Sequence, residues 1–428
     1  MSINQDNYQL PIRREVEQLK PSATLVINER SKALIAEGRA IYKLGFGQSP
    51  FPVPKVVVEA LRQNAGEKDY LPVRGLKRTR EAIAARYSKL YQIGCEAGDV
   101  MLGPGSKELI FLFQMAFDGT LLLPSPCWVS YEPQAELVGK KPVFVATKAE
   151  NNWCLQAEEL EQACAQAGDA PKYLILNYPN NPTGSTFSIS ELQGLAAVCR
   201  RHQVIVIADE IYGELTYGRA HHSLATYYPE GTIISTGLSK WAGAGGWRFG
   251  AFIFPKEMRQ MLDVMAAIAS ETFSAVSAPV QYAAITAYEP SDSVRDYLSA
   301  AKSILEAVGS YVYERLTKIN VRLNPPQGGF YLFPDFGYYR EALARKGITS
   351  SEALCRDLLE EAGIAMLPGS EFARPAGELN ARLCYVDFDG ALLLKKVLEE
   401  GEQPDAVFVE RFCPKIRGAM DAFVGYLL

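Results

Sequence analysis

The chain has 428 residues, a length that suits one large and one smaller domain around a sizeable core. Hydrophobic residues make up 48% of the sequence and charged residues 22%, which is typical of a globular protein. The formal net charge of −5 gives no basic footprint for nucleic acid, and no apolar stretch reaches the ~18 residues that would span a bilayer. Nucleic-acid and membrane partners are therefore not expected.

The N-terminal region predicts a polar arm over 1–20, followed by part of a smaller domain over 21–55. The arm lacks the apolar core of a signal peptide and is too rich in acidic residues for a transit peptide. The eight cysteines are scattered without CxxC pairs. These patterns are typical of a cytoplasmic protein with reduced thiols, so we expect no disulfide.

A Gly-rich turn leads from an early predicted strand into a helix. Residues 100–102 predict the strand, Gly103-Pro104-Gly105-Ser106 the turn, and 107–117 the apolar helix. Such a turn offers free backbone N–H groups and the positive end of a helix dipole to an anion. It is a candidate phosphate site, although turns that only connect elements are more common.

Two polar motifs follow short apolar runs that predict buried parallel strands. Run 173–176 precedes Asn177-Tyr178-Pro179-Asn180-Asn181-Pro182-Thr183-Gly184, and run 204–207 precedes Ala208-Asp209-Glu210-Ile211-Tyr212. Ligands of open α/β sheets bind at the carboxyl ends of the strands. There Asp209 can hold a pyridinium nitrogen protonated, and Tyr212 can donate to a phenolate oxygen. Taken alone, each motif also fits a helix cap or a rigid turn.

Lys240 lies in a Gly-rich turn after the apolar run 232–236. The small residues around it leave room for a planar carbonyl compound, and Arg248 can supply the positive charge that favours a neutral amine. The lysine therefore predicts imine chemistry, with an ordinary turn lysine as the alternative.

The remaining pattern predicts an α/β protein with a mostly parallel central sheet wrapped by helices and a smaller α+β domain. Helix 291–318 leads into the smaller domain, which contains a strand over 328–333 and a helix over 352–363. A surface loop over 399–405 and a helix over 413–428 complete the chain. The strand-like runs of the larger domain are 121–123, 173–176, 204–207, 232–236 and 250–254.

In their order and spacing, these motifs closely resemble the pyridoxal-phosphate-dependent aminotransferases of class I/II, which have fold type I. The resemblance runs from about Pro21 to about Asp389. Asn-Pro-Thr-Gly, Asp-Glu-Ile-Tyr and Ser-Lys with an arginine eight residues later are jointly very specific. It implies an N-terminal arm and part of the small domain over 1–55, a large cofactor-binding domain over 56–305 and the rest of the small domain over 306–428.

The resemblance implies a role for each matching residue around the cofactor, pyridoxal 5′-phosphate. Lys240 forms the imine and later moves the Cα proton, while Asp209 pairs with the ring nitrogen. Tyr212 and Asn181 bind the ring oxygen, and Trp128 stacks on the ring. The alternative for Trp128 is an ordinary core position.

The phosphate and the substrate carboxylate are each assigned a set of residues. Arg382 clamps the α-carboxylate, a bidentate task that suits a guanidinium, and Gly47 and Asn181 lie beside it. Tyr70 reaches the phosphate of the neighbouring subunit in a homodimer. The alternatives are that Arg382 is an ordinary surface arginine and that Tyr70 is an ordinary aromatic residue of a loop. The phosphate is held by Gly105, Ser106 and Arg248, and the cofactor-binding set also includes Lys107 and Ser239.

Two places depart from the family pattern, and a third matches one subgroup of the family. Gly237 stands where many relatives have a phosphate-binding Ser or Thr, so either Ser239 or Ser235 compensates or one phosphate ligand is lost. The segment Lys20-Pro21-Ser22-Ala23-Thr24 resembles the aspartate-type subgroup, in which the Ser and Thr help to bind a distal carboxylate. However, Gly47-Gln48-Ser49-Pro50-Phe51 replaces that subgroup's usual Gly-Glu-Pro-Asp-Phe. An acidic donor and an aromatic or neutral donor both remain open.

The resulting prediction is an aminotransferase that moves an amino group from an L-amino acid to a 2-oxo acid, plausibly 2-oxoglutarate. A carbon–sulfur lyase of the same fold is the enzymatic alternative, because both reactions begin with the same Cα carbanion. Related domains of transcription regulators follow a helical DNA-binding domain, which twenty polar residues cannot provide. No metal spacing is present, and His202, His221 and His222 are expected in loops or at the surface.

Overall fold

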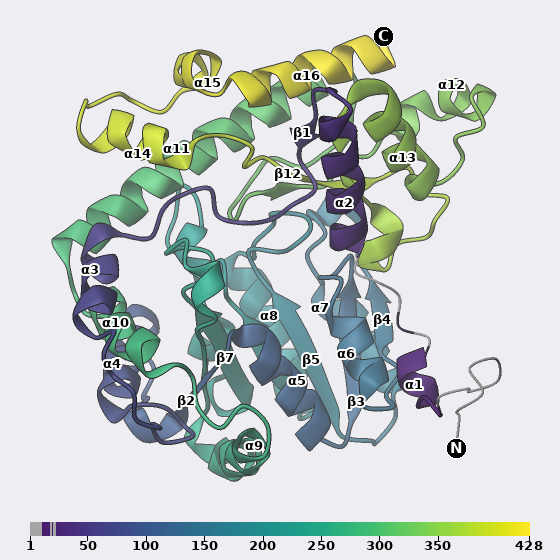
Figure 1. The fold of residues 1–428 in the computed structure, drawn as a ribbon. Coiled ribbons are helices and arrows are strands. Elements are labelled where there is room, and N and C mark those ends of the chain that lie inside the picture. Colours follow the sequence, from purple (N-terminus) through teal and green to yellow (C-terminus); the bar gives the residue numbers. More distant parts are fainter. Residues whose placement is uncertain (1–10, 18, 20–22) are drawn as a thin grey trace, which may run out of the picture.

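The computed structural model describes residues 11–17, 19 and 23–428. Figure 1 shows a larger part built around a twisted sheet and, above it in this view, a smaller part made mostly of helices. Most of the polar arm expected over 1–20 lies outside the described residues. The short helix α1 (Arg14–Glu17) belongs to the described portion of this arm.

In the described chain, seven strands form the central sheet, in the order β2-β8-β7-β6-β5-β3-β4. β8 is antiparallel to both of its neighbours, and the other pairs are parallel, so the sheet is mostly parallel as predicted. The strands are β2 (Val100–Gly103), β3 (Thr120–Ser125), β4 (Val143–Ala146), β5 (Lys172–Asn177), β6 (Ile205–Asp209), β7 (Thr232–Gly237) and β8 (Gly250–Ile253).

Helices cover both faces of this sheet, which explains why its strands are continuous apolar runs rather than alternating ones. In β5, Tyr173 and Ile175 pack on the side of α5, α6 and α9, whereas Leu174 and Leu176 pack on the side of α7 and α8. The helices of the larger part are α3 (Lys55–Gln63), α4 (Lys77–Tyr91), α5 (Ser106–Ala116), α6 (Tyr131–Leu137), α7 (Ala157–Gln166), α8 (Ile189–Arg201), α9 (Arg259–Ser270) and α10 (Ala278–Tyr288).

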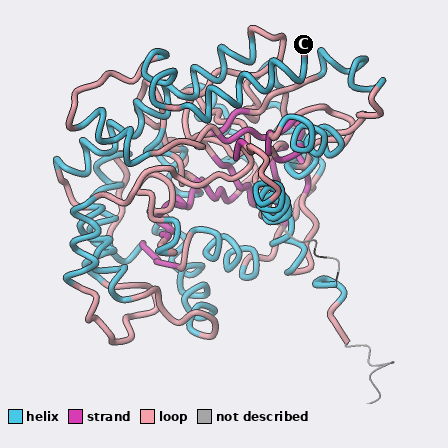
Figure 2. Tube along the Cα trace, turned by 45° about the horizontal axis from the view of Figure 1, so that its top comes forward, coloured by secondary structure: helices cyan, strands magenta, loops and turns pink. Residues whose placement is uncertain are grey.

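The smaller part contains two short sheets. Figure 2 shows helices along the top of the molecule, with strands nearer its centre. β1 (Tyr42–Lys43) pairs in parallel with β10 (Ile364–Ala365). The antiparallel sheet has the order β11-β12-β9, with β9 (Tyr331–Leu332), β11 (Leu367–Pro368) and β12 (Ala381–Cys384). The helices are α2 (Ala23–Ala36), α11 (Asp292–Thr317), α12 (Arg340–Arg345), α13 (Ser351–Ala362), α14 (Gly390–Leu398), α15 (Ala406–Phe412) and α16 (Pro414–Leu427).

Most predicted helices and strands are present, with ends that differ from the predicted ones by one or two residues, and one strand is much shorter than predicted. The strand predicted over 328–333 is reduced to the two residues of β9, because Gly329 has φ +67° and interrupts the extended backbone. The helix predicted over 107–117 begins one residue earlier, at Ser106. The domain boundary at 305/306 falls inside α11, a continuous helix, and stays a prediction. No helix in the described chain is long and apolar enough to cross a membrane.

Candidate active site

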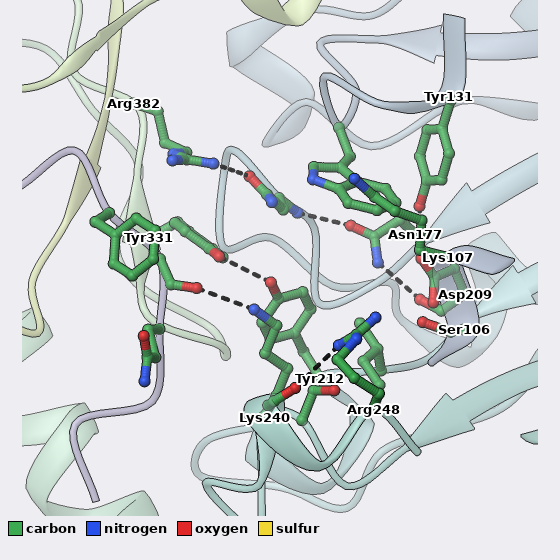
Figure 3. A pocket seen from close by; sticks show the side chains of 18 of the residues that line it. Ser106, Lys107, Tyr131, Asn177, Asp209, Tyr212, Lys240, Arg248, Tyr331 and Arg382 are labelled. Carbon is green, nitrogen blue, oxygen red and sulfur yellow. Dashed lines mark hydrogen bonds between the residues drawn. The ribbon is translucent and has the colours of Figure 1, made fainter. Parts of the chain in front are cut away.

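A cavity of about 510 Å³ lies where the carboxyl ends of the central strands meet the smaller part (Figure 3). Asn177 and Asp209 end β5 and β6, and Lys240 follows β7 by three residues. Arg382 and Tyr331 enter from β12 and β9. The cavity is lined by Phe46, Gly47, Gln48, Ser106, Lys107, Trp128, Tyr131, Asn177, Asn181, Asp209, Ile211, Tyr212, Ser239, Lys240, Gly245, Gly246, Arg248, Tyr331 and Arg382.

Lys240 projects into the cavity as a half-buried amine. Its Nζ donates a 2.9 Å hydrogen bond to the backbone oxygen of Gly47. Burial, followed by the nearby charge of Arg382, lowers the pKa of Lys240 to about 8, and Arg248 makes a smaller contribution. The expected positive neighbour is thus present, but Arg382 contributes more than the predicted Arg248. With this pKa the amine is still mostly protonated at pH 7, but its neutral fraction is far larger than that of an ordinary lysine.

Asp209 is a buried carboxylate at the end of β6, with 3% of its surface exposed. Oδ2 accepts a 2.6 Å hydrogen bond from the Tyr131 hydroxyl, and Oδ1 accepts one of 3.2 Å from Ser235. Burial raises the pKa of Asp209 to about 6, while these two hydroxyls act in the opposite direction. The carboxylate is therefore suited to accept a hydrogen bond from a protonated ring nitrogen.

The asparagine motif connects Asp209 to Arg382. The side-chain nitrogen of Asn177 donates to the backbone oxygen of Asp209 at 2.8 Å, and its Oδ1 accepts from the backbone N–H of Asn181 at 2.7 Å. Oδ1 of Asn181 then accepts a 3.0 Å bond from Nη1 of Arg382. Asn177 therefore holds the loop that brings Asn181 into the cavity.

Arg382 is a buried guanidinium, 3% exposed, without an ion-pair partner among the described residues. Nη2 donates to the backbone oxygen of Gly45 at 2.8 Å, and Nε has no hydrogen-bond partner in the described chain. The rings of Tyr331 and Phe372 have their centres 5.0 Å from the guanidinium carbon. A buried cation with these properties is prepared to bind an anion.

Tyr212 and Tyr331 form a buried pair whose hydroxyl oxygens are 2.8 Å apart. Figure 3 shows both hydroxyls beside Lys240, whose Nζ is 5.5 Å from the centre of the Tyr212 ring. Tyr212 was predicted, and Tyr331 was not. Tyr331 is fully buried at the cavity wall and closes the space next to Gly47, where an added Cβ would lie 2.2 Å from the Tyr331 hydroxyl.

The predicted phosphate cradle forms the end of the cavity opposite Arg382 (Figure 3). Ser106 begins α5, so the first N–H groups of this 11-residue helix lack partners within the helix. Gly105 has φ +93°, and a Cβ there would lie 2.3 Å from Nη2 of Arg248. Arg248 donates to the backbone oxygens of Pro104 and Gly245 at 3.2 and 3.0 Å. The turn and the arginine thus form one positively polarised end.

Gly237 has a steric explanation. It lies at the end of β7 opposite Gly250, and an added Cβ would come within 2.6 Å of the Phe249 backbone oxygen. The close approach of β7 and β8 therefore favours glycine there. Ser239 lines the cavity, whereas Ser235 is engaged with Asp209.

Trp128 and Lys107 lie side by side in the cavity wall. The Nζ atom of Lys107 is 5.0 Å from the Trp128 ring centre, and the Trp128 ring meets that of Tyr131 edge to face at 5.2 Å. Lys107 has no carboxylate partner within ion-pair distance in the described chain. Burial and the charge of Arg248 lower its pKa.

Of the predicted site residues, Gly47, Ser106, Lys107, Trp128, Asn181, Asp209, Tyr212, Ser239, Lys240, Arg248 and Arg382 line the cavity. Gly105 contributes through the space it leaves for Arg248. Tyr70 lies away from this cavity with 95% of its surface exposed, so its role across a dimer interface stays a prediction. The Lys20–Thr24 motif falls on residues and side chains outside the described set.

The sequence missed Tyr131, Asn177 and Tyr331 as site residues. Tyr131 could have been suspected from its place three residues after Trp128, but no local pattern identifies Tyr331. One histidine lies in a loop as expected, but its side chain is buried there. His221 is in a loop, yet its side chain is only 5% exposed, and its Nε2 lies 3.3 Å from Glu210 Oε2 behind the site.

The fold and this cavity together define a fold type I enzyme that is built around a lysine at the end of a mostly parallel sheet. The family model for aminotransferases of class I and II matches residues 39–389. The chain therefore belongs to the class I and II aminotransferases and transfers an amino group between an amino acid and a 2-oxo acid.

Named relatives agree with this assignment. The chain is 36% identical over 387 residues to aspartate aminotransferase of Geobacillus stearothermophilus, covering 88% of this chain and 94% of the relative. It is 32% identical to that of Bacillus subtilis, with the same coverage. The structure of aspartate aminotransferase from Thermus thermophilus with maleate matches with a TM-score of 0.84 and 26% identity, covering 97% of this chain and 99% of that one.

Proposed function

We propose that the chain carries out transamination with pyridoxal 5′-phosphate bound in the described cavity and Lys240 as the proton carrier. The observation that carries this proposal is Arg382, a buried guanidinium without an ion-pair partner in the described chain, in the same cavity as a lysine of lowered pKa. A buried cation without an ion-pair partner, beside an amine of lowered pKa, suits a substrate that has a carboxylate next to its reacting carbon.

The residues present fit this cofactor. At the phosphate end, Gly105 leaves the space that Arg248 fills, and a Cβ at Gly250 would lie 2.3 Å from the Ser106 backbone nitrogen. A helix N-terminus and an arginine at one end of the cavity suit a phosphate. At the ring end, the carboxylate of Asp209 suits a pyridinium nitrogen, and the Tyr212 hydroxyl suits a phenolate oxygen.

When bound, the cofactor supplies an electron-withdrawing ring that stabilises negative charge at the substrate Cα. Asp209 keeps the ring nitrogen protonated, and Tyr212 donates to the ring oxygen. Arg382 and Asn181 hold the α-carboxylate and thereby fix the direction of the Cα–H bond. In its neutral form, the amine of Lys240 would accept the proton from the substrate Cα. It would then deliver this proton to the C4′ carbon of the cofactor.

We propose a dicarboxylic amino acid such as aspartate as a favoured donor, with 2-oxoglutarate as the acceptor. The charged residues that line the cavity are four cations, Lys107, Lys240, Arg248 and Arg382, and one anion, Asp209. Arg248 is assigned to the phosphate and Arg382 to the α-carboxylate. Lys107, expected from the resemblance among the cofactor-binding residues, is the remaining cation that we propose for a distal carboxylate instead. The names of the relatives point the same way.

A panel of donors tests this proposal. The loaded protein is mixed with aspartate, glutamate, phenylalanine, alanine and cystathionine, and formation of pyridoxamine phosphate is followed in single half-reactions. We expect the highest kcat/KM for aspartate or glutamate. Faster reaction with phenylalanine or alanine would overturn the acidic-donor assignment. Release of ammonia and pyruvate from cystathionine, without pyridoxamine phosphate, would identify elimination, which the relatives' names do not favour.

We further propose a cytoplasmic homodimer with shared active sites. The cytoplasmic location is supported by eight free thiols, seven of them buried and one partly exposed. The dimer is supported by Tyr70, an aromatic side chain that is 95% exposed and does not line the cavity of its own chain. In a two-fold dimer, such a residue can complete the site of the other subunit.

A further inference from the structure

Tyr331 lies in the cavity wall between the strand that carries Arg382 and the loops that contain Gly47 and Gly184. It belongs to β9, which pairs with β12, the strand that carries Arg382. An added Cβ at Gly184, the glycine of the Asn-Pro-Thr-Gly motif, would lie 2.4 Å from the Tyr331 backbone oxygen, and one at Gly47 would lie 2.2 Å from its hydroxyl. Both glycines are thus held against Tyr331, which has only 1% of its surface exposed.

The hydroxyl of Tyr331 faces the ring-oxygen side of the site. It lies 2.8 Å from the Tyr212 hydroxyl, and either oxygen can be the donor. When the Tyr331 hydroxyl donates, the Tyr212 oxygen accepts this hydrogen bond. The proton of Tyr212 then points away from Tyr331. The Tyr212 proton is then free to point at the ring oxygen of the cofactor.

The ring of Tyr331 faces the carboxylate side of the site. The Arg382 guanidinium carbon lies 5.0 Å from the ring centre, within the range of cation–π attraction. Figure 3 shows Tyr331 between Tyr212 and Arg382. Arg382 has no ion-pair partner in the described chain, so its charge is stabilised by two hydrogen bonds, to Asn181 and Gly45, and by two aromatic rings.

We propose that Tyr331 is a positioning residue with two separable effects: its hydroxyl orients Tyr212 toward the ring oxygen, and its ring holds Arg382 in place for the substrate carboxylate. This inference rests on the proposed roles of Tyr212 and Arg382. It predicts that removing the hydroxyl alone perturbs the cofactor, whereas removing the ring also weakens carboxylate binding.

Tyr331→Phe tests the first effect through the absorption spectrum of the loaded protein. A donor to the ring oxygen favours the deprotonated chromophore, so its loss raises the pH midpoint of the visible band. We expect a rise of about 0.5–1 pH unit in Tyr331→Phe, the size of one hydrogen bond, and a larger rise in Tyr212→Phe. The kcat for the preferred donor should fall about three- to tenfold, with KM within about twofold.

Tyr331→Leu tests the second effect through the Kd of maleate, a carboxylate that cannot react. We expect maleate to bind about 5- to 30-fold more weakly to Tyr331→Leu, and within about twofold of the parent to Tyr331→Phe. Tyr385→Phe is the matched control. Tyr385 is a buried tyrosine of the same part, and its hydroxyl lies 3.2 Å from that of Tyr217, away from the cavity. It should change neither the midpoint nor the Kd.

The outcomes are distinguishable. A shifted midpoint in Tyr212→Phe but not in Tyr331→Phe overturns the orienting role of Tyr331 while leaving Tyr212 as assigned. An unshifted midpoint in both variants overturns the assignment of Tyr212 and the inference with it. Equal changes in Tyr331→Phe and Tyr385→Phe would show that Tyr331 acts only on stability. If Tyr331→Leu does not fold, the Tyr331→Phe result alone decides the orienting role.

Discussion

The hydroxyl of Tyr131 donates a 2.6 Å hydrogen bond to Oδ2 of Asp209, across the junction between α6 and the carboxyl end of β6. Burial alone would favour the neutral acid, and it does raise the pKa of Asp209 to about 6. The hydrogen bond from Tyr131 opposes that effect and lowers the proton affinity of the carboxylate. Asp209 therefore stays ionised near neutral pH and can pair with a protonated ring nitrogen.

Replacing either partner should slow proton transfer at Cα. Asp209→Asn removes the charge that keeps the ring nitrogen protonated, so we expect the half-reaction rate to fall by several orders of magnitude. Tyr131→Phe removes one hydrogen bond and should cost about tenfold, or ~1.4 kcal/mol. Stopped-flow measurement of single half-reactions checks both values. Tyr288→Phe is the control, because the buried Tyr288 hydroxyl has no hydrogen-bond partner in the described chain.

A rate for Asp209→Asn within about tenfold of the parent would assign this residue to structure alone. If Tyr131→Phe and Tyr288→Phe change the half-reaction rate equally, Tyr131 has no specific role in the active site.

Lys240 should carry the cofactor covalently in the resting protein. We expect a yellow protein in which borohydride attaches the cofactor to Lys240, as identified by peptide mass spectrometry. Lys240→Ala should retain non-covalent binding through the phosphate and ring contacts, yet lose nearly all transamination because no amine accepts the Cα proton. Label on another lysine would refute the assignment. Retained turnover in Lys240→Ala would exclude it as the proton carrier.

The sequence predicted the parts of this site that follow strands directly. Asp209, Asn181 and Lys240 come at or just after apolar runs, and parallel strands bring such positions to one edge of a sheet. Tyr131 and Tyr331 could not be predicted in this way. Their hydrogen bonds join residues 78 and 119 positions apart, and they depend on how α6 and β9 pack against the sheet.

The shortened strand β9 has a more local cause. Residues 328–333 are apolar enough to predict a strand, but the positive φ of Gly329 limits β9 to two residues. That turn presents the Tyr331 side chain to Tyr212. The apolar pattern of this segment therefore predicted its place in the chain but not the turn at Gly329 that shortens the strand.

Arg382→Lys should chiefly weaken substrate binding. An ammonium cannot reproduce the paired hydrogen bonds of a guanidinium to a carboxylate, so we expect KM to rise about 10- to 100-fold. Steady-state kinetics with the preferred donor measures this change. Arg374→Lys is the matched control, since Arg374 forms a paired contact with Glu378 in the same part of the chain and away from the cavity. An unchanged KM in Arg382→Lys would place the carboxylate clamp elsewhere.

The lowered pKa of Lys240 predicts a pH-dependent stability of the cofactor-free protein. The folded value of about 8 lies below the usual value, so the unfolded chain binds more protons between about pH 8 and 10.5. The penalty for burying this amine is therefore fully present below pH 8 and is relieved as the pH rises through that window. Lys240→Met should stabilise the apoprotein by about 1–2 kcal/mol at pH 7, after allowance for the half-buried position and the lost hydrogen bond to Gly47.

Urea unfolding of the parent and Lys240→Met apoproteins at pH 7 and pH 9.5 measures this difference. We expect the difference in the free energy of unfolding between the two apoproteins to be at least halved at pH 9.5. A difference that is constant with pH would mean that the amine has an ordinary pKa in the folded protein.

Shared active sites can be tested with a mixed dimer of Lys240→Ala and Tyr70→Phe subunits. If Tyr70 reaches the phosphate of the partner's site, each parent dimer has two damaged sites, whereas the mixed dimer has one site with both lesions and one with neither. Mixing the two variants should therefore recover activity that neither shows alone, up to about half of the unchanged rate per mixed dimer. Subunit exchange is confirmed by native mass spectrometry. A fully active monomer, or no recovery despite complete exchange and a severe Tyr70→Phe defect, would contradict the shared site and leave Tyr70 as an exposed loop aromatic.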